Sequence, residues 1–284
     1  MRMHWQTIKR YWPLFKSLQT LLLTVTGVAG FMSARCPITH WSSMVALVFS
    51  MLFAIAGSTA LNMWYDRDID SVMNRTHHRP LAQGKIPPRN ALGLGLVLSM
   101  LGVGIGFLLA PLYSLILLLG IVFDFLVYTI WLKRRTCWSI VWGGIAGGMP
   151  ILAGRVLGMG QVDVIGILLM LSVLFWIPTH ILTFSIQYAE DYAAAGIPTF
   201  PSTYGIKFTR NVVVISTIIA VALITAAAIL IQVSGGFLHL LGILSGALVM
   251  MALFVLFKPS RKANIGLFKY ASVYMLATML LLAF

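Results

Sequence analysis

Long apolar segments alternate with short polar segments along the whole chain. We predict nine apolar spans, at about residues 17–34, 43–64, 91–109, 112–132, 139–157, 164–187, 211–233, 236–257 and 267–284. Each is close to the roughly 20 residues that a helix needs to cross a bilayer. Because unpaired backbone groups are costly in lipid, each span should be helical. The pattern predicts an all-α polytopic membrane protein, with one domain over residues 1–284.

Composition and charge agree with a membrane protein. Of the residues, 60% are hydrophobic and 10% are charged, whereas a soluble domain is about half apolar and a quarter charged. The net charge of +13 would suggest a nucleic-acid partner in a soluble protein. Here the basic residues lie between the apolar spans, so we expect the lipid bilayer and no nucleic acid as the partner.

The loops that carry the basic residues alternate along the chain. If the N-terminus is cytoplasmic, 18 of the 20 Lys and Arg residues lie on the cytoplasmic side, and only Arg35 and Arg155 fall outside it. This bias predicts an odd number of spans and a cytoplasmic N-terminus. We expect the membrane to be the plasma membrane of a prokaryote.

Acidic residues gather in two of the same loops. Of the seven acidic residues, five follow spans two and six: Asp66, Asp68, Asp70, Glu190 and Asp191. The positive-inside rule does not require acids on that side. Their clustering therefore indicates a functional site on the cytoplasmic side.

The first acidic segment has the spacing of one helical face. Asn62, Asp66 and Asp70 recur every four residues, which places them about 6 Å apart along a helix. Their mutual repulsion favours a bound cation, and Mg²⁺ typically binds one or two carboxylates together with phosphate oxygens and water. The alternative is a solvated helix end whose acids pair with Arg67 and Arg75.

Two basic segments lie near the acids in sequence. Arg75, Arg79 and Lys85 follow in a loop shaped by Pro and Gly, and Lys133, Arg134 and Arg135 end the fourth span. Guanidinium and ammonium groups beside a metal site suit a diphosphate. Positive-inside residues and snorkelling anchors are the alternative interpretations.

Other polar positions lie in or near the spans. His180 is a functional candidate within span six, although a histidine bonded to a neighbouring helix explains it equally well. If spans two and six pack together, Glu190 and Asp191 could hold a second metal ion. Residues 143–150 are rich in Gly and indicate close helix packing, while Asp124 could be a buried acid or a pocket residue.

Together these segments resemble the UbiA superfamily of intramembrane prenyltransferases, and in detail its protoheme IX farnesyltransferase branch. The matching segments are 62–84, 128–136, 143–150, 178–180 and 191–198. The sequence departs from the family pattern at Leu18, Thr179, Gln187 and Ala189. Gln187 stands where an aspartate is usual, and Leu18 replaces an expected basic residue.

The resemblance implies nine helices around a central cavity and Mg²⁺-dependent transfer of a farnesyl group from farnesyl diphosphate to haem B, giving haem O. A downstream haem-modifying enzyme would be a further partner. Asn62, Asp66, Asp70 and Asp191 would bind metal, with Glu190 supporting a second ion. The predicted diphosphate contacts are Arg67, Arg75, Arg79, Lys133, Arg134 and Arg135, and His180 would lie near the haem.

Two other functions fit parts of the pattern. A related prenyltransferase could act on a quinone precursor or a glycerol lipid. An ion-coupled transporter would place its ionisable residues near the bilayer midplane on broken helices. The acids here crowd one surface, which argues against transport.

Overall fold

The computed structural model describes residues 10–35 and 41–283. Within these ranges the chain is helical, contains no strand, and forms nine helices long and apolar enough to cross a membrane. The elements are η1 (Trp12–Phe15), α2 (Ser17–Met32), α3 (Trp41–Tyr65), α4 (Arg67–Val72), α5 (Pro88–Leu109), α6 (Pro111–Ile121), η2 (Val122–Leu132), α7 (Ser139–Met159), α8 (Val164–Gln187), α9 (Ala189–Ala194), α10 (Phe200–Leu230), α11 (Gly235–Phe257) and α12 (Arg261–Ala283). The prediction of an all-helical protein with nine spans is confirmed. Arg2 and Lys9, two of the 18 basic residues predicted on the cytoplasmic side, and Phe284, the end of the last predicted span, lie outside the described ranges.

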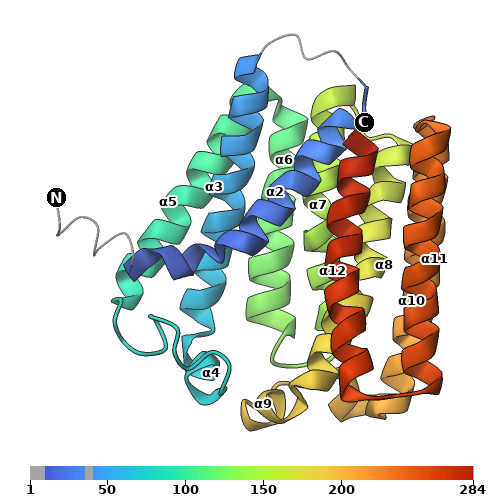
Figure 1. Ribbon diagram of the computed structural model, residues 1–284. Helices are drawn as coiled ribbons and strands as arrows, with labels where there is room; N and C mark the ends of the chain where they lie inside the picture. The colour runs from blue at the N-terminus through green and yellow to red at the C-terminus, as the bar shows by residue number, and fades with distance from the viewer. Residues whose placement is uncertain (1–9, 36–40, 284) are drawn as a thin grey trace.

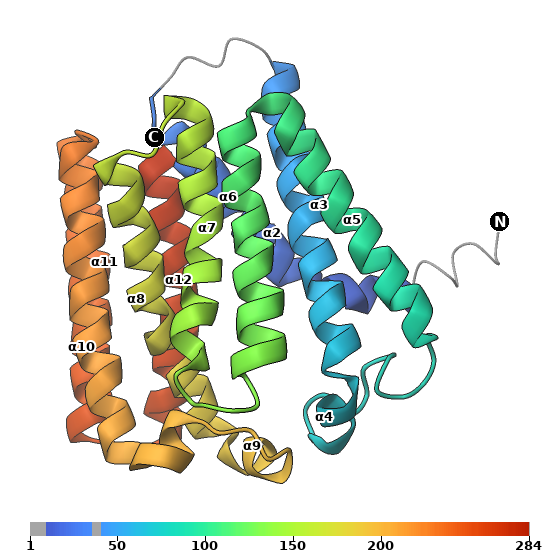
Figure 2. The ribbon, with the colours of Figure 1, turned by 180° about the vertical axis from the view of Figure 1, so that it is seen from behind.

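Helix boundaries differ most at the seventh span. We expected it to begin at 211, because Lys207 and Arg210 lower the local hydropathy, but α10 begins at Phe200. Thr199 and Ser202 form a capping box, which satisfies free backbone N–H groups at that end. Gly205 then bends the first part of α10 with a φ of +82°. The polar start of this helix therefore runs at the end of the molecule that also carries α4 and α9 (Figures 1 and 2).

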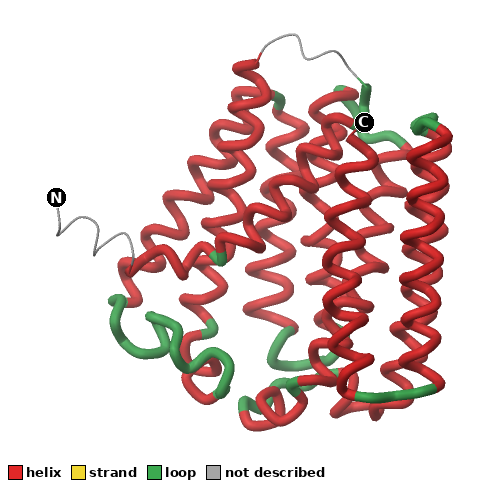
Figure 3. The backbone as a smooth tube through the Cα atoms, in the orientation of Figure 1, coloured by secondary structure: helices red, strands yellow, loops and turns green. Residues whose placement is uncertain are grey.

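The long helices pack side by side, and the short helices lie at one end. α3 packs mainly against α5, whereas α8 packs against α10, α7 and α12. α4 and α9 lie next to each other at the same end of the bundle in both views (Figures 1 and 2). Loops join the helices at the two ends, as Figure 3 shows. A second metal ion was expected if spans two and six pack together. The polar ends of these spans do come together, but the helices α3 and α8 themselves do not pack against each other.

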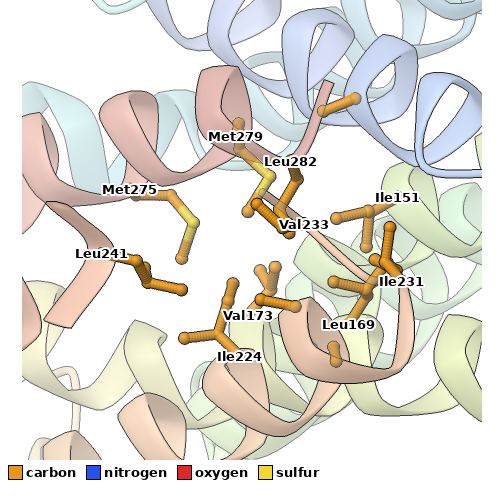
Figure 4. Packing of buried hydrophobic residues seen from close by; sticks show 13 residues of the cluster. Ile151, Leu169, Val173, Ile224, Ile231, Val233, Leu241, Met275, Met279 and Leu282 are labelled. Atoms are coloured by element: carbon orange, nitrogen blue, oxygen red, sulfur yellow. The ribbon is translucent and has the colours of Figure 1, made fainter. Parts of the chain in front are cut away.

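Apolar side chains fill the spaces between the helices. One cluster joins α7, α8, α10, α11 and α12, and its members Ile151, Leu169 and Ile224 are almost fully buried (Figure 4). A second cluster joins α3, α6 and α7. Many large apolar side chains remain exposed on the outside of the bundle, including Leu108, Ile243 and Phe257. This outer surface suits lipid rather than water.

Small residues allow α2 and α7 to approach closely. A methyl group on Gly154 would overlap the carbonyl oxygen of Gly27, and one on Gly30 would overlap that of Ile151. Helix contact in membranes depends on such close approach, because lipid gives little hydrophobic driving force. In the predicted packing segment, Gly144 and Gly148 likewise face side chains of α8.

We expect Gly154→Ala to destabilise the protein by about 1–3 kcal/mol, because the added methyl group must push α2 away from α7. Thermal unfolding in detergent, read by tryptophan fluorescence, measures the effect. Gly104→Ala is the matched control, since a Cβ at Gly104 meets no atom within 4 Å and alanine favours the helix. Equal melting temperatures for the two variants would contradict this account of the α2–α7 contact.

Candidate active site

The acidic stripe lies where α3 passes into α4. Asp66 separates the two helices, and the backbone bonds from Asp66 N to Asn62 O and from Asp70 N to Asp66 O, both 2.9 Å, continue the helical path. Asn62, Asp66 and Asp70 are 8%, 5% and 5% exposed. The predicted stripe is therefore present, and it faces the inside of the molecule rather than solvent.

Each acid of the first segment pairs with a cation. Lys133 donates to Asp66 Oδ2, and Arg79 donates to both oxygens of Asp70 at 2.8 and 2.9 Å. Arg134 makes two 2.7 Å bonds to Asp68, whose side chain is 59% exposed. These hydrogen bonds from Arg134 hold the pKa of Asp68 below its usual value. The pairs bring the fourth span and the loop after α4 to the stripe.

One carboxylate oxygen of the stripe has no hydrogen bond. Asp66 Oδ1 is buried without a hydrogen-bond donor, and the nearest ion-pair atom is Arg134 Nη2 at 4.0 Å. A buried acceptor without a donor is costly unless a ligand supplies the missing interaction. Oxygen atoms of carboxylate and amide groups are the ligands that Mg²⁺ prefers. Asp66 therefore fits a hard metal ion.

The rest of the donor set is sparse. Within the described ranges, no three His, Cys, Asp or Glu side chains converge as a complete metal cage. Mg²⁺ is commonly bound by one or two carboxylates, with water and substrate phosphate completing its coordination. The residues present therefore fit an ion that binds together with an anionic substrate.

Arg75 links the two acidic segments. Its backbone N–H donates to Asp191 Oδ2 at 3.2 Å, and its guanidinium lies 4.9 Å from the ring of Phe184 and 5.7 Å from that of Tyr188. Arg75 Nε is buried without a partner. Asp191 itself is 8% exposed. The loop after α4 thus joins the polar ends of α3 and α8, although the helices are not neighbours.

The fourth span continues the polar group toward the membrane interior. Its second half, η2, is a π-helix, a geometry that is frequent at functional sites. Asp124 Oδ2 accepts from Ser58 Oγ at 2.6 Å and from Asn62 Nδ2 at 2.7 Å. Thr129 Oγ1 lies 3.0 Å from Asn62 Oδ1. Asp124, which the sequence left unassigned, therefore belongs to the same polar group as Asn62.

Three predicted site residues are not gathered with the others. Arg67 is exposed and donates to the Trp64 carbonyl at 2.7 Å, so it caps the end of the preceding helix, α3. Arg135 and Glu190 are also exposed. The alternative pairing of the acids with Arg67 and Arg75 is wrong, because Arg79, Lys133 and Arg134 take those positions.

Lys16 is a site residue that the sequence analysis passed over. It lies between η1 and α2 with a left-handed φ of 40°, and Asp66, Asp124, Arg79 and Lys133 act on its charge. The sequence signal was a lone lysine at the start of the first span. The basic residue retained near this helix start is thus Lys16, whereas the Leu18 side chain is 70% exposed.

Gln187 and His180 are held by α12. With its amide oxygen toward Arg261, Gln187 accepts from Nε at 2.8 Å and from Nη2 at 3.0 Å. His180 lies between the rings of Trp176 and Phe268, with centroid distances of 5.0 and 4.4 Å. Ser272 Oγ is 3.2 Å from His180 Nδ1. The position usually held by an acid is thus occupied by a neutral amide bound to arginine.

Comparison with known proteins adds to this geometry. The model of the UbiA prenyltransferase family matches residues 22–276. A protoheme IX farnesyltransferase from Korarchaeum cryptofilum is 39% identical over 210 residues, covering 74% of this chain and 71% of that one. The protoheme IX farnesyltransferase from Orientia tsutsugamushi is 35% identical over 274 residues, covering 95% and 86%.

Solved structures share the fold. A digeranylgeranylglyceryl phosphate synthase superposes with a TM-score of 0.81 at 20% identity, covering 98% of both chains. A UbiA homologue from Archaeoglobus fulgidus, bound to GPP and Mg²⁺, superposes with a TM-score of 0.70 at 17% identity, covering 97% of this chain and all of that one. These likenesses establish the arrangement of the helices.

Proposed function

The chain belongs to the UbiA prenyltransferase family and is a membrane prenyltransferase, and from this premise we propose that it farnesylates haem B. In the proposed reaction, a haem vinyl group attacks C1 of the farnesyl group as the C–O bond to diphosphate breaks, and water then adds to the resulting carbocation and releases a proton, so that the products are haem O and diphosphate. Mg²⁺ is the proposed cofactor. Relatives named protoheme IX farnesyltransferase support this acceptor. The observation that carries the proposal is the buried group in which Asp66 and Asp70 lie beside Lys133 and Arg79.

The acidic residues have the proposed role of metal ligands. Asn62, Asp66, Asp70 and Asp191 supply oxygen atoms from the two joined polar ends. A bound Mg²⁺ would neutralise negative charge on the leaving diphosphate. Glu190 remains a predicted ligand of a second metal ion, and its exposed side chain would approach that ion from the solvent side.

The cations have the proposed role of diphosphate ligands. Lys133, Arg79 and Arg134 now pair with Asp66, Asp70 and Asp68, and the same donors suit phosphate oxygens. Placing positive charge where negative charge develops lowers the barrier to cleavage of the C–O bond. The apolar helices would hold the farnesyl tail and exclude water from the allylic cation. Arg67 and Arg135 remain weaker predictions, because both side chains are exposed.

His180 is the proposed residue near the haem. Ser272 Oγ lies 3.0 Å from the Phe268 carbonyl oxygen, to which it can donate, and 3.2 Å from His180 Nδ1. In the proposed role, Nδ1 donates to Ser272 Oγ and Nε2 keeps its lone pair. A hydrogen bond of this kind is typical of histidines that bind metals.

The membrane placement extends the same proposal. The chain is a multi-pass membrane protein, with nine apolar helices within residues 10–35 and 41–283. We propose that the end carrying α4 and α9 faces the cytoplasm of a prokaryotic cell, where the basic loops gather and farnesyl diphosphate is soluble. A haem-modifying enzyme would consume the product. The transporter alternative lacks support, because the ion pairs of Asp66, Asp68 and Asp70 gather at one end of the bundle.

Mass spectrometry of the haem products tests the acceptor. We expect purified protein in lipid nanodiscs, supplied with haem B, farnesyl diphosphate and Mg²⁺, to produce haem of the mass of haem O. Parallel reactions with a quinone precursor or a glycerol phosphate lipid, and with geranylgeranyl diphosphate, define the specificity. A prenylated quinone or lipid together with unmodified haem would overturn the haem assignment and leave prenyl transfer intact.

A further inference from the structure

Asp124 is a carboxylate within the fourth span that the proposed reaction does not use. It lies one turn deeper in the membrane than the Asp66 end of the stripe, beside Asn62. Its Oδ2 accepts two short hydrogen bonds, from Ser58 Oγ at 2.6 Å and from Asn62 Nδ2 at 2.7 Å. An ionisable side chain within a span is costly and commonly functional. The geometry points to a role through Asn62.

We propose that Asp124 is a positioning residue that orients the Asn62 amide so that its oxygen, and not its nitrogen, can bind the metal. The inference rests on the proposed function, in which Asn62 is a metal ligand. Only the amide oxygen has lone pairs for Mg²⁺, whereas the NH₂ group can only donate. An asparagine in this position is useful in one of its two orientations.

The Asp124 carboxylate selects between those orientations. In the observed orientation, Asn62 Nδ2 donates to Asp124 Oδ2 at 2.7 Å. Turning the amide by 180° would place its oxygen against the carboxylate, so two acceptors would face each other and one hydrogen bond would be lost. Because Asn62 is only 8% exposed, water offers little compensation.

The Thr129 hydroxyl can occupy the Asn62 oxygen that would bind the metal. Its hydroxyl lies 3.0 Å from Asn62 Oδ1 and 2.9 Å from the carbonyl oxygen of Asp124. The hydroxyl has one proton, so it donates to one of these acceptors at a time. When it bonds to the carbonyl, Asn62 Oδ1 is free. The π-helix thus places Asp124 and Thr129, five residues apart, on either side of the same amide.

Substitutions at Asp124 separate its geometry from its charge. Both hydrogen bonds end on one oxygen, Oδ2, so the carbonyl oxygen of Asp124→Asn can accept them, whereas Asp124→Leu cannot. We expect the leucine variant to weaken Mn²⁺ binding by 10-fold or more, the range typical for residues that orient metal ligands. The asparagine variant should bind within about threefold of the original protein, because its carbonyl oxygen still fixes the Asn62 amide, although through hydrogen bonds about half as strong.

Binding is measured on the full chain in nanodiscs, as Mn²⁺ titrations followed by electron paramagnetic resonance in the presence of inorganic diphosphate. The Mg²⁺ concentration that gives half-maximal turnover should shift in the same order, with kcat at saturating Mg²⁺ changing less. Tyr113→Phe is the matched control. Tyr113 lies in the same span as Asp124 but away from the site, and the substitution removes its buried hydrogen bond to Ser50 of α3. Asp124→Ala serves if the leucine variant does not fold.

Normal Mn²⁺ affinity in the leucine or alanine variant would overturn the inference. Equal loss in the leucine and asparagine variants would also overturn it, because the charge of Asp124 would then matter and not its orientation of Asn62. Asp66→Ala separates this inference from the proposed function. If that variant binds Mn²⁺ normally, the metal site itself is misplaced; if it loses binding while Asp124→Leu does not, only the role of Asp124 is wrong.

Discussion

Replacing Asp66 with alanine should lower the turnover of prenyl transfer by about 10³-fold while the protein stays folded. The substitution removes the buried Oδ1 that has no hydrogen-bond donor and leaves Lys133 without its carboxylate partner. Loss of a fixed group that stabilises developing charge typically costs 10²–10³-fold, and loss of a metal ligand adds to this. Product formation at saturating Mg²⁺ and farnesyl diphosphate gives the rate.

Asp68→Ala is the matched control for this prediction. It removes the same charge two residues along the chain, but the Asp68 side chain is 59% exposed and its pair with Arg134 lies near solvent. Exposed ion pairs contribute little to stability, so turnover should fall by no more than a few-fold. Full activity of Asp66→Ala after removal of divalent ions by chelation would refute the proposed metal site.

Replacing Arg155 with leucine should lower the free energy of unfolding by about 3–5 kcal/mol, the cost of leaving one partner of a buried ion pair alone. The Arg155 side chain is 4% exposed and donates to Asp163 through Nε at 2.8 Å and through Nη2 at 2.6 Å. Its Nη1 donates to the carbonyl and hydroxyl oxygens of Ser33. One guanidinium thus joins the ends of α2, α7 and α8.

The same pair predicts a pH dependence of stability. Hydrogen bonds from Arg155 hold the pKa of Asp163 below its usual value of about 3.9. A group whose folded pKa is lowered contributes stability above its unfolded pKa, and this contribution is lost as the pH falls through the folded pKa. We therefore expect the melting temperature of the original protein to fall below about pH 4, and that of Arg155→Leu to fall less over the same range.

Thermal unfolding in detergent, measured between about pH 3 and pH 7 to bracket the usual aspartate pKa, checks both results. Arg35→Ala is the matched control close by in the sequence, because Arg35 is exposed and its bond within the described part of the chain, to the Gln232 carbonyl, is a long one of 3.3 Å. If Arg155→Leu and Arg35→Ala melt at the same temperature at neutral pH, the buried Arg155–Asp163 pair does not stabilise the packing of α2, α7 and α8.

The spans were predictable because crossing a membrane is a local property of the chain. An apolar run of sufficient length must be helical in lipid, whatever lies beside it. The start of α10 was missed because Lys207 and Arg210 lowered the local hydropathy, whereas Thr199 and Ser202 cap a helix that begins near the membrane surface. Capping depends on a few side-chain hydrogen bonds, which a hydropathy window does not register.

The residues of the candidate site could be predicted from the sequence, but the partners with which they form ion pairs and hydrogen bonds could not. Asn62, Asp66 and Asp70 share a helical face through their spacing alone. Their partners come from elsewhere: Lys133 lies 67 residues from Asp66, and Asp124 lies 62 residues from Asn62. Nearby Arg67 seemed an equally good partner by sequence, but its side chain turns back to the Trp64 carbonyl.

The apolar spans, the gathering of acids and cations at one end of them, and the chemistry that such groups favour could all be inferred from the amino-acid sequence alone. These features follow from hydropathy, helical spacing and side-chain charge, which act over a few residues. Three features became visible in the folded chain alone: Arg75 joins Asp191 to the first acidic segment, Glu190 and Arg135 stay exposed, and Asp124 contacts Asn62. Those outcomes depend on which helices pack together, and close packing of small residues sets that choice over distances that sequence spacing does not encode.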